Sequence, residues 1–171
     1  MFEVSINYKD INISNVVMDD LNCIQKWFNK KNNLVYYGND DYLEINEINE
    51  IFLEYYISES EIFLKILKDN ALIGIFKGRI EFKDENIIWI SCFVLDCFYL
   101  DNNEGNIILD KILKFFLHNY GIKEFLIGIS VKEKKTLNLL MSNGFKLVRI
   151  SNDFFINSQS SSNAMIMKRN I

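Results

Sequence analysis

Residues 100–121, LDNNEGNIILDKILKFFLHNYG, begin as a polar run with one glycine and then become an amphipathic helix. The apolar residues of the second part recur at helical spacing and are Ile108, Leu109, Ile112, Leu113, Phe116 and Leu117. Gly121 marks the end of the helix, because glycine readily adopts the left-handed conformation that closes many helices. The polar run allows two interpretations: a phosphate-binding turn, or an ordinary loop in which Asn103 or Asn106 caps the helix.

The segment before this stretch, residues 61–100, is rich in β-branched and aromatic residues. Turn signals at residues 69–70 and 83–86 divide it into three runs, which predicts an antiparallel three-stranded meander. Nearer the N-terminus we predict a strand over 10–16 and helices over 18–31 and 44–57. Asp19 or Asp20 is the expected cap of the first helix.

The segment after it predicts a strand over 124–131, a helix over 132–143 and strands over 145–150 and 164–169, with a loop over 157–163. The element order is therefore β-α-α-β-β-β-α-β-α-β-β. A front half rich in hairpins followed by a β-α-β unit predicts an α/β protein with a mixed sheet and helices on both faces.

The chain has 171 residues, of which 49% are hydrophobic, so we expect a single domain over 1–171. A net charge of -4 and only three arginines argue against a nucleic-acid partner. The three cysteines lack metal-ligand spacing and are expected to be buried thiols, and a single histidine gives no reason to expect a metal. No apolar run is long enough to span a membrane, and we expect a soluble, cytoplasmic protein.

Three stretches resemble the GNAT superfamily of N-acyltransferases, as does the element order along nearly the whole chain. Residues 93–113, FVLDCFYLDNNEGNIILDKIL, resemble its strand, cofactor loop and helix, and residues 137–148, LNLLMSNGFKLV, resemble its helix-to-strand motif. Residues 24–56 are similar to the front of the aminoglycoside 6'-N-acetyltransferase-like branch. The resemblance implies a mostly antiparallel sheet whose central parallel pair splays apart at the cofactor site. It also implies acetyl-CoA as cosubstrate.

In this family the pyrophosphate of acetyl-CoA is held by backbone N–H groups at a helix N-terminus, where the helix dipole favours an anion. The resemblance places this role on six consecutive residues: Asn102, Asn103, Glu104, Gly105, Asn106 and Ile107. It also implies that the pantetheine arm pairs with the main chain of the preceding strand, along Phe93, Val94 and Leu95. These three residues also fit a buried central strand, and both roles are compatible because the contact uses main chain.

Three side chains that the family usually has, two of which handle protons and one of which contacts the cofactor, are replaced in this sequence. Ser91 stands near the usual strand carboxylate, Leu140 stands where the family has a tyrosine, and Glu133 replaces an asparagine. Asp96 and Tyr99, at the end of the strand, join Ser91 as catalytic candidates. The candidates for binding the amine lie in the front loop and are Tyr36, Tyr37, Asp40 and Asp41. The alternatives are packing for the tyrosines and a solvated turn for the two aspartates.

Two functions follow from these residues. The first is an N-acetyltransferase that moves an acetyl group from acetyl-CoA to a primary amine of a small molecule. The second is a GNAT-fold binding or partner-interaction module with impaired catalysis, which the replaced side chains favour. The aromatic content and the strand-rich C-terminal part are also compatible with a homodimer.

Overall fold

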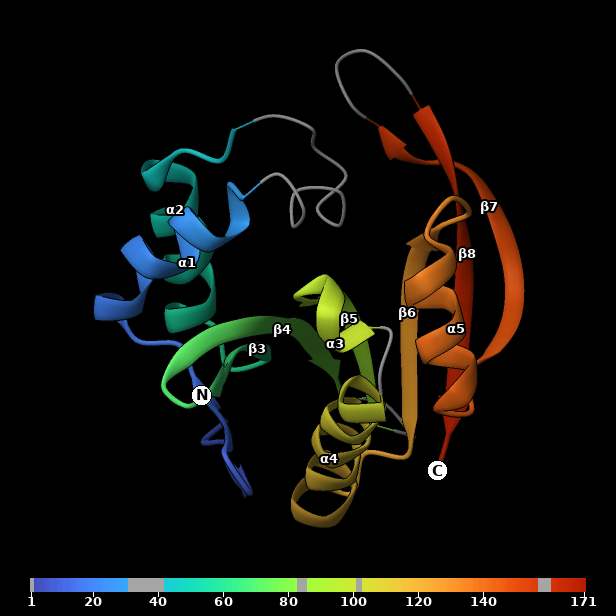
Figure 1. Ribbon diagram of the computed structural model, residues 1–171. Helices are drawn as coiled ribbons and strands as arrows, with labels where there is room; N and C mark the ends of the chain where they lie inside the picture. The colour runs from blue at the N-terminus through green and yellow to red at the C-terminus, as the bar shows by residue number, and fades with distance from the viewer. Residues whose placement is uncertain (1, 31–41, 83–85, 101–102, 157–160) are drawn as a thin grey trace. The chain divides into compact units, whose positions relative to one another are not determined.

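The computed structural model describes residues 2–30, 42–82, 86–100, 103–156 and 161–171 (Figure 1). The helices and strands within these residues are β1 (Ser5–Tyr8), β2 (Ile11–Asn15), the short 3-10 helix η1 (Met18–Asp20), α1 (Leu21–Phe28), α2 (Ile45–Ile57), β3 (Glu61–Lys68), β4 (Ala71–Glu81), β5 (Ile87–Leu95), α3 (Cys97–Leu100), α4 (Asn103–Tyr120), β6 (Glu124–Ser130), α5 (Lys134–Ser142), β7 (Lys146–Ile156) and β8 (Ser161–Asn170).

The strands form a sheet with the order β1-β2-β3-β4-β5-β6-β8-β7. Strands β5 and β6 run parallel, and the pairs on either side, such as β3–β4 and β6–β8, are antiparallel. The predicted meander and the parallel neighbour of its last strand are thus confirmed. The parallel register begins at Ile87 opposite Glu124 and reaches Ile90 opposite Ile127, whereas β5 continues to Leu95 and β6 to Ser130.

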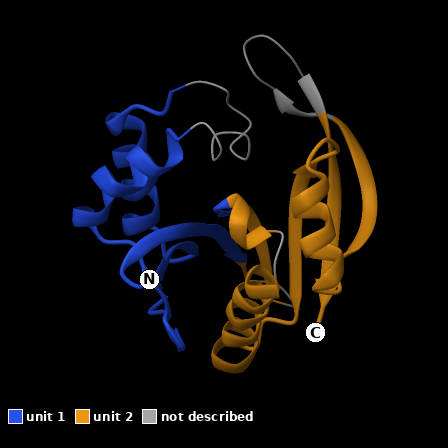
Figure 2. Ribbon diagram, viewed as in Figure 1, with its two compact units in different colours: residues 1–80, 92–96 blue, residues 81–91, 97–171 orange. Residues whose placement is uncertain are grey.

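The chain divides into two compact units (Figure 2). The first comprises residues 1–80 and 92–96. Its helices α1 and α2 pack against one face of its strands, through a buried cluster that contains Ile24, Phe28, Phe52, Phe63 and Ile75. The helical spacing predicted for 44–57 is confirmed, because α2 covers Ile45–Ile57 with its periodic apolar residues turned inward.

Three local features of the first unit differ from the prediction or refine it. An N-terminal hairpin of β1 and β2 replaces the single predicted strand, and Lys9 in its turn has a φ of 54°. The Asp69–Asn70 turn is confirmed, with φ values of 49° and 64°. Asp20 stands at the N-cap of α1 and makes no capping bond to that helix, but its carboxylate accepts the Val17 N–H at the start of η1 at 2.8 Å and also Lys65 Nζ at 2.6 Å.

The second unit comprises residues 81–91 and 97–171. Helix α4 presents its predicted apolar face to the core, where Ile112 and Phe116 are fully buried, and it ends at Gly121 with a φ of 66°. Helix α5 contacts both α3 and α4. Strands β7 and β8 are longer than predicted, and β8 begins at Ser161, inside the stretch expected to be a loop. Helix α3 was not predicted.

The cysteines are only partly as expected. Cys92 is buried, and burial raises the pKa of its thiol to about 12, so the thiol stays protonated at neutral pH. Cys23 and Cys97 are exposed, so the expectation of burial was wrong for both. Among the described residues, no helix is long and apolar enough to cross a membrane.

Candidate active site

Most of the polar run found in the sequence belongs to α4 itself. Helix α4 begins at Asn103, so Asn103 to Ile107 form its start, and the helix begins earlier than either interpretation of the polar run assumed. Leu100, the last residue of α3, is also buried, so the chain just before α4 also turns a side chain toward the interior. Asn102 lies outside the described residues. The N-terminus of a helix therefore lies within the stretch predicted to bind the pyrophosphate.

Gly105 has a packing role in this turn. It is buried, and a Cβ placed on it would overlap the carbonyl oxygen of Tyr99 and approach Leu139 Cδ1 to 2.9 Å. The absence of a side chain therefore lets α4 lie directly on the main chain of α3 and against α5. The family resemblance implied that this glycine is one of the residues that hold the pyrophosphate, and the structure gives a packing reason for the absence of a side chain here.

A pocket of about 320 Å³ lies at this end of α4. Residues from α3, α4 and α5 line it: Leu100, Asn103, Asn106, Lys135, Asn138, Leu139 and Ser142. The lining is rich in amide side chains and includes the basic residue Lys135, and none of these residues is acidic. Glu104, which would repel phosphates, is half-buried and does not line the pocket. The set of donors suits a phosphate group.

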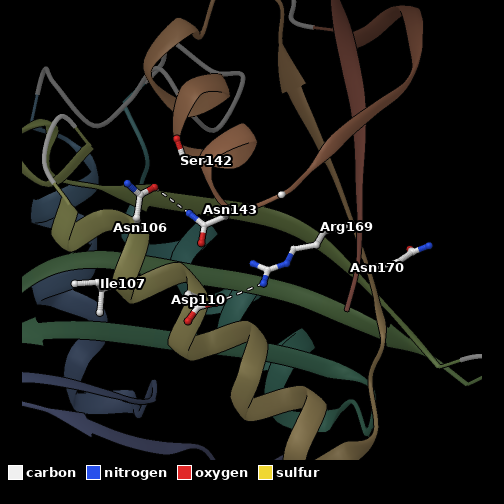
Figure 3. Close-up of a pocket in the computed structure, with 8 residues that line it drawn as sticks. Asn106, Ile107, Asp110, Ser142, Asn143, Arg169 and Asn170 are labelled. Carbon is white, nitrogen blue, oxygen red and sulfur yellow. Dashed lines mark hydrogen bonds and ion pairs between the residues drawn. The ribbon is translucent and has the colours of Figure 1, made fainter.

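Two asparagines, Asn106 of α4 and Asn143 at the end of α5, join these two helices (Figure 3). The Asn143 side chain donates to Asn106 Oδ1 at 3.0 Å and to the Leu139 carbonyl oxygen at 3.0 Å. Asn143 is buried, so these bonds satisfy an amide that would otherwise be costly to bury. They fix the C-terminal end of α5 to the first turns of α4.

The three predicted catalytic residues occupy different settings. Ser91 is exposed on β5. Asp96 follows β5, is half-buried, and accepts a hydrogen bond from the indole nitrogen of Trp27 at 3.1 Å. Tyr99 lies in α3, where its ring packs edge-on against Phe98 and its carbonyl oxygen faces Gly105.

The predicted pantetheine strand is buried by its side chains, since Phe93, Val94 and Leu95 are each at most 4% exposed. The N–H of Asp96 donates to the Ile73 carbonyl oxygen at 2.9 Å, so it points toward β4. The carbonyl oxygen of Val94 points the same way, because a Cβ added at Gly74 of β4 would meet it at 2.7 Å.

Neighbouring residues of a strand direct their main-chain groups to opposite edges. Leu95 lies between Val94 and Asp96, so its N–H and C=O point away from β4. By the same alternation, the N–H and C=O of Phe93 also point away from β4. These main-chain groups lie beyond Ile90, where the parallel pairing of β5 with β6 ends.

The replaced family residues have structural roles. Leu140 is fully buried, and Glu133 is the N-cap of α5, where its carbonyl oxygen accepts the Leu137 N–H at 2.9 Å. The predicted amine-binding residues Tyr36, Tyr37, Asp40 and Asp41 lie outside the described residues.

Sequence reasoning missed the contribution of α5 to the pocket and the partner of Asp96. Lys135 belongs to the KEKK run at the start of a predicted helix, and that basic run was the available signal. No local pattern could have revealed the Trp27 contact, which joins residues 69 positions apart.

Comparison with protein families gives one match over most of the chain. The model of the acetyltransferase (GNAT) domain matches residues 13–166. A search of curated protein sequences found no match.

Solved structures share the fold at low sequence identity. One is a spermidine N-acetyltransferase from Vibrio cholerae in complex with CoA and spermine, with 13% identity, a TM-score of 0.80, and coverage of 95% of this chain and 96% of that one. Another, from Salmonella typhimurium, modifies the N-terminal serine of the 50S ribosomal subunit protein L7/L12, with 13% identity, a TM-score of 0.83 and 96% coverage of both chains. A third is the microcin C7 self-immunity acetyltransferase in complex with acetyl-CoA and AMP, with 15% identity, a TM-score of 0.80, and coverage of 96% and 94%.

Proposed function

Because the chain belongs to the GNAT acetyltransferase family, we propose that it transfers an acetyl group from acetyl-CoA to a primary amine of a small molecule. The family match over residues 13–166 is the observation that carries this proposal. The fold shared with enzymes that were solved with CoA or acetyl-CoA supports the choice of cosubstrate.

In this proposal the pyrophosphate lies at the N-terminus of α4, on the main chain of residues 102–107. The pocket lined by Asn103, Asn106 and Lys135 supports this placement, because amide donors, an ammonium and a helix N-terminus all favour an anion. The contribution of Gly105 is indirect, since it allows the first turn of α4 to lie against α3.

The pantetheine arm is proposed to pair with the main chain of Phe93 and Leu95. The main-chain groups of Leu95 face away from β4, which is the orientation that such pairing requires. Val94 contributes its buried side chain, which packs β5 against the helices of the first unit.

Acetyl-CoA would supply the activated acetyl group, and the protein's tasks are to orient the amine and to move protons. An alkyl amine is mostly protonated at neutral pH, so it needs a proton acceptor before it can attack. Asp96 is the proposed acceptor, because Trp27 holds one of its oxygens and thereby orients the carboxylate. Tyr99 is the proposed donor to the departing thiolate, and Ser91 is proposed to relay a proton by its hydroxyl.

The amine is proposed to bind near Tyr36, Tyr37, Asp40 and Asp41. Two adjacent carboxylates attract a cationic ligand, and the aromatic rings can contact its ammonium group. A cytoplasmic location and a homodimer belong to the same proposal, because acetyl-CoA is an intracellular metabolite and the strand-rich C-terminal part offers edges for pairing.

The second candidate is a binding module with impaired catalysis. The specific observations in its favour are the full burial of Leu140, where the family places a tyrosine, and the capping position of Glu133. A leucine side chain cannot protonate a departing thiolate as a tyrosine can.

The test is release of CoA thiol from acetyl-CoA in the presence of a polyamine, an amino sugar or a peptide with a free N-terminus, with mass spectrometry of the acceptor. Acetylation of a small amine that is lost in Asp96→Asn but kept in Asp69→Asn would support the proposal. Asp69 is an exposed turn residue, so its variant controls for the same chemical change. If only the peptide is acetylated, the acceptor is a peptide N-terminus and not a small molecule. Acetyl-CoA binding without transfer to any acceptor would favour the binding module.

A further inference from the structure

A second pocket, of about 490 Å³, lies in the same unit and is not used by the proposed reaction (Figure 3). It is lined by the first turns of α4, the end of α5 and the end of β8: Asn106, Ile107, Asp110, Ser142, Asn143, Gly144, Arg169 and Asn170. Asn106 and Ser142 line both this pocket and the one at the N-terminus of α4, so the two are adjacent.

Arg169 is the unusual residue of this pocket. Its side chain is only 15% exposed, and its Nη1 atom is buried with no hydrogen-bond partner in the described structure. Its Nη2 atom makes a long contact of 3.4 Å with Asp110 Oδ1. A guanidinium carries five N–H donors in a fixed plane and always keeps its charge. A buried donor without an acceptor is costly, which indicates that a ligand can complete this site.

The charges around Arg169 favour an anionic ligand. Asp110 also accepts from Lys114 Nζ at 2.8 Å, so one carboxylate is shared by two cations. A smaller adjacent pocket of about 220 Å³ is lined by Lys146 and Lys168, and Lys168 pairs with Glu124 at 2.6 Å. Arg169, Lys114, Lys146 and Lys168 thus stand against the two carboxylates of Asp110 and Glu124, which leaves an excess of positive charge here in a chain whose net charge is -4.

Gly144 lines the pocket beside Arg169. It has a φ of 78°, and a Cβ added to it would lie 4.0 Å from Arg169 Nε. The hydroxyl of Ser142 and the amide of Asn170 line the same pocket and are able to donate to oxygen atoms.

We propose that this pocket binds a phosphate monoester, with Arg169 as its principal contact. A guanidinium pairs with two phosphate oxygens at once, which suits the buried Nη1 and the weakly engaged Nη2. The phosphate belongs either to the 3'-phosphate of CoA or to a separate small phosphate ester. The first source rests on the proposed function, whereas the second does not.

The experiment is calorimetric titration of the full chain with CoA and with dephospho-CoA, together with ³¹P NMR of inorganic phosphate. The variants are Arg169→Met, which keeps the aliphatic stem, and Arg169→Lys, which keeps only the charge. Arg149→Met is the matched control, because Arg149 is exposed on β7 and lines none of these pockets. Thermal unfolding of each variant establishes that it is folded.

If the 3'-phosphate occupies the pocket, Arg169→Met weakens CoA binding about tenfold or more and leaves dephospho-CoA binding unchanged. The CoA affinity of Arg169→Lys then lies between those of wild type and Arg169→Met. If a separate phosphate ester occupies it, inorganic phosphate shows saturable line broadening that Arg169→Met removes and Arg149→Met retains. The ³¹P NMR measurement gives a result even if the chain does not bind CoA. Equal binding of CoA by wild type and Arg169→Met, with no saturable phosphate binding, would overturn the proposal.

Discussion

The indole nitrogen of Trp27 donates a hydrogen bond of 3.1 Å to Oδ1 of Asp96, which links α1 to the residue that follows β5. Trp27 is only 2% exposed, so the ring that holds this carboxylate is itself held by the core of the first unit. A hydrogen bond from a buried donor orients the carboxylate that accepts it. This relationship makes Asp96 the strongest of the three catalytic candidates.

Asp96→Asn should lower kcat by about a hundredfold or more, because an amide cannot accept the proton that a carboxylate accepts. The melting temperature should hardly change, since the amide oxygen can still accept from Trp27. Steady-state kinetics and thermal unfolding measure the two effects. An unchanged kcat would remove Asp96 from proton transfer.

Trp27→Phe tests the positioning role separately. It should lower kcat less than Asp96→Asn does, while the KM for acetyl-CoA stays the same, because only the orientation of the carboxylate is lost. Some loss of stability is expected, since the indole is buried. If kcat is unaffected at a temperature where the variant is folded, the hydrogen bond serves stability alone.

Gly105→Ala should destabilise the fold, because the new Cβ would overlap the Tyr99 carbonyl oxygen. Overpacking of this kind costs about 1–3 kcal/mol of unfolding free energy. The control is Gly121→Asn, where nothing lies within 4 Å of an added Cβ and asparagine tolerates the left-handed backbone. Similar small losses in both variants, measured by denaturant unfolding, would show that α4 does not need this close contact.

Lys135→Met should weaken CoA binding several-fold, with a smaller effect at high salt, because the ammonium is exposed and its attraction to phosphate is screened. Lys134→Met is the matched control, since Lys134 is also exposed but does not line the pocket. Titration at two salt concentrations distinguishes them. Equal losses in the two variants would indicate a general charge effect in place of a specific contact.

The sequence was sufficient for the main elements of the fold. The meander of β3, β4 and β5, the long helix α4 and the parallel strand β6 follow from local periodicity and turn residues, and the structure confirms them. The family resemblance is likewise confirmed by the match over residues 13–166.

The features that were missed depend on tertiary contacts. Helix α3 is only four residues long and carries little periodic signal. The role of Gly105 depends on a carbonyl group of α3. The carboxylate of Asp20 accepts the Val17 N–H at the start of η1, but its ion pair with Lys65 of β3 could not be predicted from local sequence. The roles of Tyr36, Tyr37, Asp40 and Asp41 stay predictions.

The Asp40→Asn, Asp41→Asn double variant should raise the KM for an active amine about tenfold, the equivalent of ~1.4 kcal/mol of binding free energy. The reason is the loss of two carboxylates that attract the cationic substrate, and the KM for acetyl-CoA should not change. Initial-rate kinetics with each substrate varied in turn provide the measurement. Unchanged amine kinetics would exclude both residues from the acceptor site.

Acid should destabilise the protein partly through Asp110. Burial raises the pKa of this carboxyl, but the hydrogen bonds and charges of Lys114 and Arg169 outweigh it and hold the pKa below its ordinary value of 3.8. The lowered pKa stabilises the folded state above pH 3.8, and this contribution is lost as the pH falls through the folded-state pKa. The stability advantage of wild type over Asp110→Asn should therefore shrink below pH 3.8. A pH-independent difference in unfolding free energy would contradict this.

The central claim is that acetyl-CoA is the cosubstrate, and the most direct measurement is the melting temperature with and without saturating acetyl-CoA. A ligand that binds only the folded state, at about one hundred times its Kd, adds ~2.7 kcal/mol of stability. At roughly 2–4 °C per kcal/mol, the melting temperature should rise by about 5–10 °C. Pantetheine should give a clearly smaller rise, because it lacks the pyrophosphate that the N-terminus of α4 is proposed to hold. No rise with millimolar acetyl-CoA would contradict the account.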